Sequence, residues 1–339
     1  MAVARLPLIE SHPTWRAAQV VGLLATVALL VAFVAAPTTS LHLLWDMVIP
    51  LLPAVFIVNP MLWRNVCPLA SLNELGGRRR ESPTLGPTWL VPSWAVGIAL
   101  LALLVPARRF LFNAHGLPTL VTVSAVAVLA LASGFVVSRR GGFCNSICPV
   151  LPVEKLYGQA PLMDVGSARC SDCNKCASLG CVDLAGRKSA VQSVVASGQW
   201  HWALTPFGLF AAAFPGFIIG YFTTEDGPFT SALAVYGHVA LWSAASLFIA
   251  LGLVLVSRVR SAVALFLLGA ASIVAYYWFA APRLVTAYGG GAFTGEIVRA
   301  VALLGIAVWG LRGWRQAART GNARRPLAMT PPPSTTSPS

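Results

Sequence analysis

The chain has 339 residues, of which 57% are hydrophobic and only 10% are charged, and its mean hydropathy is +0.73. A soluble domain carries about 25% charged residues, so this composition excludes an ordinary soluble protein and indicates an integral membrane protein. The net charge of +13 does not indicate a nucleic-acid partner, because Lys and Arg gather in the cytoplasmic loops of membrane proteins.

Apolar runs of about 20 residues, long enough to cross a lipid bilayer as a helix, occur eight times along the chain. The second is the weakest, because it contains Asp46, Pro50, Pro53 and Pro60 and also fits a re-entrant pair of short helices. We therefore predict an all-α integral membrane protein with about eight transmembrane helices, and at least six. The eight runs are 17–36, 42–63, 89–106, 118–137, 203–221, 232–257, 261–281 and 293–311.

The distribution of positive charge predicts the topology. With the N-terminus inside, the segments predicted to face the cytoplasm hold 20 of the 24 Lys and Arg residues, as the cytoplasmic side of a membrane protein should. The cytoplasm then contains both termini and the loops 64–88 and 138–202. The remaining four are Arg108, Arg109, Arg283 and Arg299.

The order of the spans divides the chain into four parts. A first transmembrane half covers 1–137, a cysteine-rich cytoplasmic segment covers 138–202, and a second transmembrane half covers 203–316. The tail, 317–339, is rich in Pro, Ser and Thr. Such a segment cannot bury enough apolar surface to fold, so we expect it to be disordered.

Six of the seven cysteines fall within 38 residues, in two patterns. Cys144 and Cys148 are separated by three residues, and Pro149 follows them. The second pattern is the run Cys170, Cys173, Cys176 and Cys181. Cys67 lies far upstream but repeats the Cys-Pro ending. All seven follow the second or the fourth predicted span and so face the cytoplasm, where thiols stay reduced, which favours a metal site over disulfides.

The spacing of Cys170, Cys173 and Cys176 is typical of a [4Fe–4S] site. A tight loop carries three thiolates to the cluster, and a more distant cysteine supplies the fourth. Structural zinc sites usually place two Cys-x2-Cys pairs apart, which three consecutive x2 spacings fit poorly. Inert buried thiols are a third reading. We therefore predict an iron–sulfur segment in the cytoplasmic loop.

Seven thiols complete one [4Fe–4S] cluster and leave three for a second. Trp63 stands where a second Cys-x3-Cys-Pro motif would have its first cysteine. In one partition, the run 170–181 binds the first cluster and the other three thiols bind the second. In a ferredoxin-style crossing, Cys148 and Cys181 exchange places. The incomplete site then has an open or non-cysteine ligand, holds three irons, or stays empty.

The combination of apolar spans, a Cys-x3-Cys-Pro motif after paired Arg and Gly (139–144), and a ferredoxin-like run resembles the membrane polyferredoxins. This family includes the quinol-oxidising ferredoxin-type subunit of periplasmic nitrate reduction, the nitrous-oxide-reductase maturation regulator and the cbb3 oxidase assembly iron–sulfur protein. The resemblance covers about residues 60–185. The chain departs from the pattern at Trp63, in the four-residue gap before Cys181, and at Val182.

The resemblance implies electron transfer between a membrane donor, such as a quinol, and a redox partner protein. It implies [4Fe–4S] clusters on the cytoplasmic side of a bacterial inner membrane. The residues to which it gives the role of cluster ligand are Cys67, Cys144, Cys148, Cys170, Cys173, Cys176 and Cys181.

Three ionisable residues within the spans are further candidates for a quinol or haem site. His42 and Asp46 are four residues apart, so they share one face of a helix, and His238 falls near the outer end of the sixth span. Ionisable groups at membrane depth are functional candidates by default. The alternative is a hydrogen-bonded pair at the membrane interface.

We therefore expect an electron carrier or redox subunit rather than a stand-alone catalyst. Its predicted activity is the transfer of single electrons through [4Fe–4S] clusters. A metal-handling maturation factor or an iron–sulfur redox sensor is the alternative, because an incomplete site suits a labile cluster. A transporter with a structural zinc site is a weaker third reading, because the spans show no repeated pair of broken helices.

Overall fold

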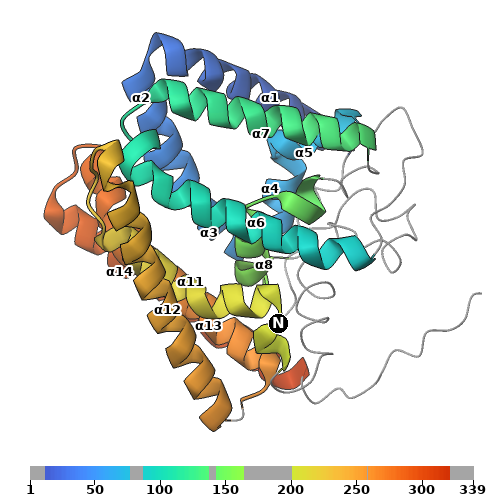
Figure 1. Cartoon of the computed structure of the whole chain (residues 1–339), viewed down its shortest axis with the longest axis vertical. Helices are drawn as coiled ribbons and strands as arrows, with labels where there is room; N and C mark the ends of the chain where they lie inside the picture. Colours follow the sequence, from blue (N-terminus) through green and yellow to red (C-terminus); the bar gives the residue numbers. More distant parts are fainter. Residues whose placement is uncertain (1–11, 77–86, 137–142, 164–200, 258, 321–339) are drawn as a thin grey trace, which may run out of the picture.

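The structure is a computed structural model and describes residues 12–76, 87–136, 143–163, 201–257 and 259–320 (Figure 1). Within these ranges every regular element is a helix. Eight stretches are long and apolar enough to cross a membrane, which confirms the predicted all-α multi-pass fold and its eight spans. They are Thr14–Ala35, Pro37–Val58, Trp94–Phe112, Gly116–Val136, Pro206–Thr223, Phe229–Ser257, Ser261–Ala287 and Ala292–Arg315.

The helices divide between the two halves of the chain. The first half contains α1 (His12–Ala35), α2 (Pro37–His42), η2 (Leu43–Val48), α3 (Ile49–Val58), α4 (Pro60–Val66), α5 (Pro68–Gly76), α6 (Pro87–Ala107), η4 (Arg108–Phe112) and α7 (Gly116–Val136). Two short elements follow, η5 (Phe143–Ile147) and α8 (Leu151–Tyr157). The second half contains η7 (His201–Leu204), α11 (Pro206–Thr223), η8 (Phe229–Ser231), α12 (Ala232–Ser257), α13 (Ser261–Ala287) and α14 (Ala292–Thr320).

The long helices form two groups with α6 and α8 between them (Figure 1). In one group, α1 and α5 pack against α7. In the other, α11 packs against α12 and α13, and α13 packs against α14. In Figure 1, the short elements α4, α5 and α8 lie near the middle of the view, and η5 contacts α5 and α6.

Helix α11 is the centre of the apolar core. Most of its residues are buried, and the core around it includes Phe56 from α3, Tyr157 from α8 and Trp309 from α14. Gly216 and Gly220 let α12 approach closely, since a Cβ at Gly216 would lie 2.0 Å from the carbonyl oxygen of Trp242. Two glycines separated by three residues are common where helices pack closely in membranes, and this spacing is visible in the sequence.

The second span begins earlier and ends earlier than the predicted run 42–63. It covers Pro37–Val58 and ends because Asn59 is extended, with φ −170° and ψ 126°. An extended residue is favoured before Pro60, and the Asn59 side chain accepts a hydrogen bond from the N–H of Met61 at 2.7 Å. Residues 60–63 therefore belong to the separate helix α4 rather than to the span, and the span is not a re-entrant pair.

The hydroxyl of Tyr277 is inserted into the backbone ladder of α3. It accepts a hydrogen bond from the N–H of Ala54 at 3.0 Å and donates one to the carbonyl of Pro50 at 2.9 Å. A side chain in this position replaces one helical hydrogen bond with two. It satisfies backbone groups that have no water to bind within a membrane.

Arg109 has a structural role that explains its exception to the predicted charge pattern. Its guanidinium donates to the carbonyl of Tyr221 at 2.9 and 3.2 Å and binds Asp226 at 2.8 Å. A cation near the C-terminal carbonyls of α11 also complements the helix dipole. Arg108 lies over the Trp45 ring at 4.1 Å.

Replacing Tyr277 with Phe should destabilise the protein by about 1–3 kcal/mol, because two buried backbone groups lose their partner. Unfolding by a denaturing detergent, followed by circular dichroism, measures this change. Tyr288→Phe is the control, since Tyr288 is 59% exposed and its loss should change stability by less than about 0.5 kcal/mol. Equal effects of the two substitutions would contradict the role given to the Tyr277 hydroxyl.

Candidate metal centre

Cys67 lies at the junction of α4 and α5. Its N–H donates to the carbonyl of Trp63 at 2.7 Å, which completes α4, and Pro68 begins α5. The backbone N–H groups of Ala70 and Leu69, in the first turn of α5, lower the pKa of the Cys67 thiol. The sulfur therefore lies close to the N-terminus of α5.

Cys148 lies in the turn just before α8. Its N–H donates to the carbonyl of Phe143 at 3.2 Å, and its carbonyl accepts the N–H of Leu151 at 3.2 Å. Pro149 follows Cys148, and α8 begins two residues later, at Leu151. The backbone N–H groups of Val150 and Leu151 lower the pKa of the Cys148 thiol. Each Cys-Pro pair thus stands at or just before the start of a short helix.

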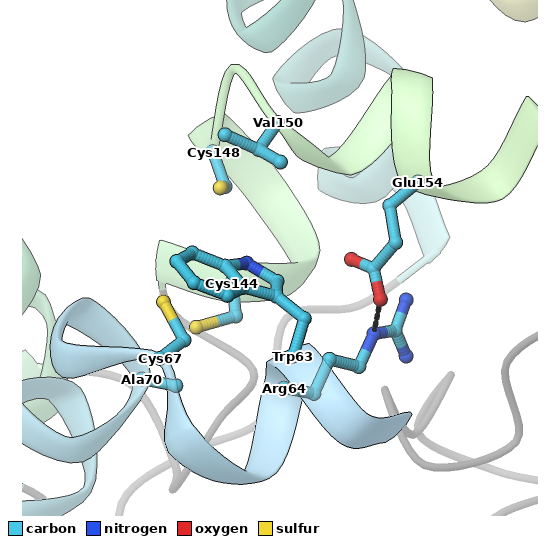
Figure 2. Close-up of a pocket in the computed structure, with 8 residues that line it drawn as sticks. All are labelled: Trp63, Arg64, Cys67, Ala70, Cys144, Cys148, Val150 and Glu154. Carbon is cyan, nitrogen blue, oxygen red and sulfur yellow. Dashed lines mark hydrogen bonds and ion pairs between the residues drawn. The ribbon is translucent and has the colours of Figure 1, made fainter. Parts of the chain in front are cut away.

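The two Cys-Pro turns bring three thiols to one pocket (Figure 2). Cys144 comes from η5, four residues before Cys148. The space between the lining residues is about 30 Å³, which is room for about two water molecules. The thiols are free rather than disulfide-bonded. The pocket is lined by Trp63, Arg64, Cys67, Ala70, Cys144, Cys148, Val150 and Glu154.

A buried ion pair forms the opposite wall of this thiol pocket. The Nε of Arg64 donates to Oε1 of Glu154, and both side chains are 6% exposed. The two terminal nitrogens of Arg64 have no hydrogen-bond partner among the described residues. Lys155, next along α8, lies over the Trp94 ring at 4.0 Å, and burial lowers its pKa to about 7.

Electrostatics make the thiol pocket a poor place for free thiolates. Burial raises the pKa of Cys67 to about 11 and that of Cys148 to about 12, against an ordinary value of 9.0. Burial and the charge of its neighbours also raise the pKa of Cys144 well above that value, while Arg64 lowers it. The thiols therefore stay protonated unless a cation replaces their protons, which is the usual coupling of metal binding to deprotonation.

Within the described ranges, no group of three or more Cys, His, Asp or Glu side chains is placed to hold a metal ion. Thiols are the donors that iron–sulfur clusters take, one thiolate for each iron. Among the described residues, Cys67, Cys144 and Cys148 are therefore the ones that would hold such a cluster.

Trp63 occupies the position that the sequence pattern assigns to a missing cysteine. It precedes Cys67 by four residues, as Cys144 precedes Cys148. In the view of Figure 2, its indole crosses the space between the sulfur of Cys148 and those of Cys67 and Cys144, with the Arg64–Glu154 pair to one side. The ring therefore belongs to the thiol pocket itself.

The structure describes three of the seven predicted cysteine ligands. It brings together Cys67, Cys144 and Cys148, the three thiols that remain when the run 170–181 is assigned its own cluster. The predicted ligands outside the described residues are Cys170, Cys173, Cys176 and Cys181.

The membrane candidates each have a local partner. His42 Nδ1 lies 2.5 Å from Asp46 Oδ2, with the side chains 50% and 36% exposed. His238 Nε2 lies 3.0 Å from the Thr223 hydroxyl. These contacts match the interfacial alternative and leave the quinol and haem assignments as predictions.

Sequence reasoning missed Arg64 and Glu154 as members of the thiol pocket. Glu154 belongs to a rare type, since Asp and Glu together number 11 in 339 residues. Their closeness in sequence to the Cys-Pro turns was a signal that they share the site. Their contact across 90 residues was not readable, because it depends on how α4 and α8 pack.

No model of a known protein family matches the chain, and no curated protein or solved structure matches it either.

In metal-free protein, Cys67 and Cys148 should react slowly with iodoacetamide at about pH 7, because only thiolate reacts. Their rates should rise about tenfold per pH unit up to the raised pKa values, whereas unfolded protein should level off near 9.0. Mass spectrometry after timed labelling measures both. The protonated thiols favour the fold, so stability is full below about pH 9 and falls as the pH rises through about 11 to 12. Equal labelling of folded and unfolded chains would contradict this.

Proposed function

We propose that the chain is a membrane-integral iron–sulfur protein that passes single electrons between a membrane donor, such as a quinol, and a redox partner protein. One observation carries the proposal: Cys67 and Cys148, from two Cys-Pro turns 81 positions apart in the sequence, line one buried pocket with Cys144. The resemblance to membrane polyferredoxins agrees with it.

The chain's own residues would tune a cluster bound in the thiol pocket. Such a cluster supplies reversible one-electron chemistry, and its potential depends on hydrogen bonds to sulfur, nearby charge and exposure to solvent. Four backbone N–H groups lie close enough to lower the pKa values of Cys67 and Cys148. These groups and the Arg64 charge stabilise added negative charge, so they favour reduction.

The proposed topology puts the thiol pocket on the cytoplasmic side. The two Cys-Pro turns follow the second and the fourth of the eight candidate spans. If every candidate helix crosses the membrane, turns after even-numbered spans emerge on the same side. The predicted positive-inside bias makes this the cytoplasmic side of a bacterial inner membrane.

The run Cys170, Cys173, Cys176 and Cys181 is proposed to bind a second cluster, a [4Fe–4S] cubane, on the basis of its spacing. That cluster and the pocket cluster would form a two-step path for electrons. A maturation factor or redox sensor is the second candidate, and the observation in its favour is the presence of three thiols rather than four in the pocket.

Anaerobically purified protein should contain acid-labile sulfide and more iron than the about four atoms of one cubane. Replacing Cys67 and Cys148 with Ser should reduce the iron to about four per chain, because only the run 170–181 would remain. Iron and sulfide assays, with electron paramagnetic resonance (EPR) of the reduced protein, measure this. Ser71→Ala is the control, since Ser71 contacts the Cys67 carbonyl but adds no ligand.

Purified protein that contains zinc and no acid-labile sulfide would contradict the proposed electron transfer. A reversible cycle with quinol or a partner protein indicates a relay. Loss of the cluster on oxidation indicates a sensor.

A further inference from the structure

Three arginines gather where odd-numbered spans end. Arg108 and Arg109 lie in the last turn of the third candidate span, and Arg283 lies one turn before the end of the seventh. If every candidate helix crosses the membrane, these ends lie on the side away from the two Cys-Pro turns, which is the outer side in the proposed topology. The positive-inside bias places few cations there, so these three need a reason of their own.

Part of this charge completes the end of α11. Arg109 donates to the carbonyl of Tyr221, and Nη2 of Arg283 donates to the carbonyl of Phe222 at 2.8 Å. The last carbonyls of a helix have no N–H partner within the helix. These bonds therefore explain Arg109 and one nitrogen of Arg283, but they leave Arg108 unexplained.

The guanidinium of Arg108 is fixed by its neighbours. Its Nε donates to Oδ1 of Asn113 at 3.1 Å, and the Asn113 amide donates in turn to Asp226 at 3.0 and 3.2 Å. Its Cζ lies 4.1 Å from the centre of the Trp45 ring, and the Trp45 indole donates to the carbonyl of Phe112 at 3.2 Å. The two terminal nitrogens of Arg108 have no hydrogen-bond partner among the described residues. A planar guanidinium that is fixed but unpaired is preorganised for a ligand.

The charges around Arg108 favour an anion. Arg108 and Arg109 both act electrostatically on Arg283, so three cations share this region. Asp226 is already bound by Arg109. Glu225, the residue before it, is exposed and forms no ion pair with another described residue. Even with both carboxylates counted, positive charge remains in excess, and a bound anion would offset the repulsion between the arginines.

We propose that Arg108 and Arg283 bind a phosphate group at the outer surface of the membrane, carried by an anionic lipid headgroup or by a free phosphate ion. The several oxygens of a phosphate match the paired N–H groups of a guanidinium. Trp45 supports Arg108 at the level where aromatic side chains meet lipid headgroups. Asp46, which follows Trp45, binds His42 instead. This site shares no residue with the thiol pocket, so it stands or falls independently of the proposed function.

The test is a lipid competition on the full-length protein, purified in detergent and stripped of lipid, with native mass spectrometry as the readout. The protein should bind phosphatidylglycerol about 25-fold more tightly than phosphatidylcholine, since each arginine near a headgroup contributes about fivefold. Arg108→Gln and Arg283→Gln should each reduce this preference to about fivefold.

Arg299→Gln is the matched control. Arg299 also lies in a span, near its predicted outer end, but it is paired with Glu296 and lies over the Trp278 ring at 4.7 Å. Its replacement should leave the lipid preference unchanged. If Arg108→Gln does not fold, Arg108→Lys, which keeps the charge but loses the planar fork, and Arg283→Gln carry the test.

Inorganic phosphate distinguishes the two sources of the phosphate group. Displacement of phosphatidylglycerol by millimolar phosphate, lost in Arg108→Gln, would support a site for the free ion. Retention of the lipid under the same conditions would support a headgroup site. Equal binding of the two lipids together with no effect of phosphate would overturn the proposal, and so would an equal loss of preference in Arg299→Gln.

Discussion

The buried ion pair between Arg64 and Glu154 is the interaction on which the thiol pocket depends. It joins α4 to α8 across 90 residues of sequence. Each helix lies directly beside one Cys-Pro turn, so the pair fixes the distance between the two turns. Removing two charges from water costs free energy. A well-packed apolar contact would join the two helices without this cost.

The membrane helices supply a rigid base for this pocket. Helix α11 fills the centre of the core, and Gly216 brings α12 against it. The segment after α8 is tied to the end of the second span, where Leu162 and Met163 donate to the carbonyls of Ile57 and Val58 at 3.0 and 3.1 Å. The short elements that carry the cysteines are therefore anchored to the spans rather than to one another alone.

The sequence predicted the parts of this structure that depend on local pattern. All eight spans follow from apolar length, and the Cys-Pro echo indicated that Cys67 belongs with Cys144 and Cys148. The end of the second span was misjudged, because the capping of α4 by Asn59 outweighs apolar continuity. The Tyr277 hydroxyl and the Arg64–Glu154 pair were not predictable, since each joins residues that only the packing of distant helices brings together. The sequence shows that Trp63 stands in place of a cysteine of the motif, but only the folded structure shows that Trp63 lines the pocket.

The long separation between the two Cys-Pro turns has a consequence for how the protein is made. Cys67 follows the second span, whereas Cys144 and Cys148 follow the fourth, so the thiol pocket does not exist until four helices have been inserted and packed. A nascent chain emerging from the ribosome has no such site. Under the proposed function, iron and sulfide would reach these thiols only after the fourth candidate span has been made, so membrane insertion would precede metal binding.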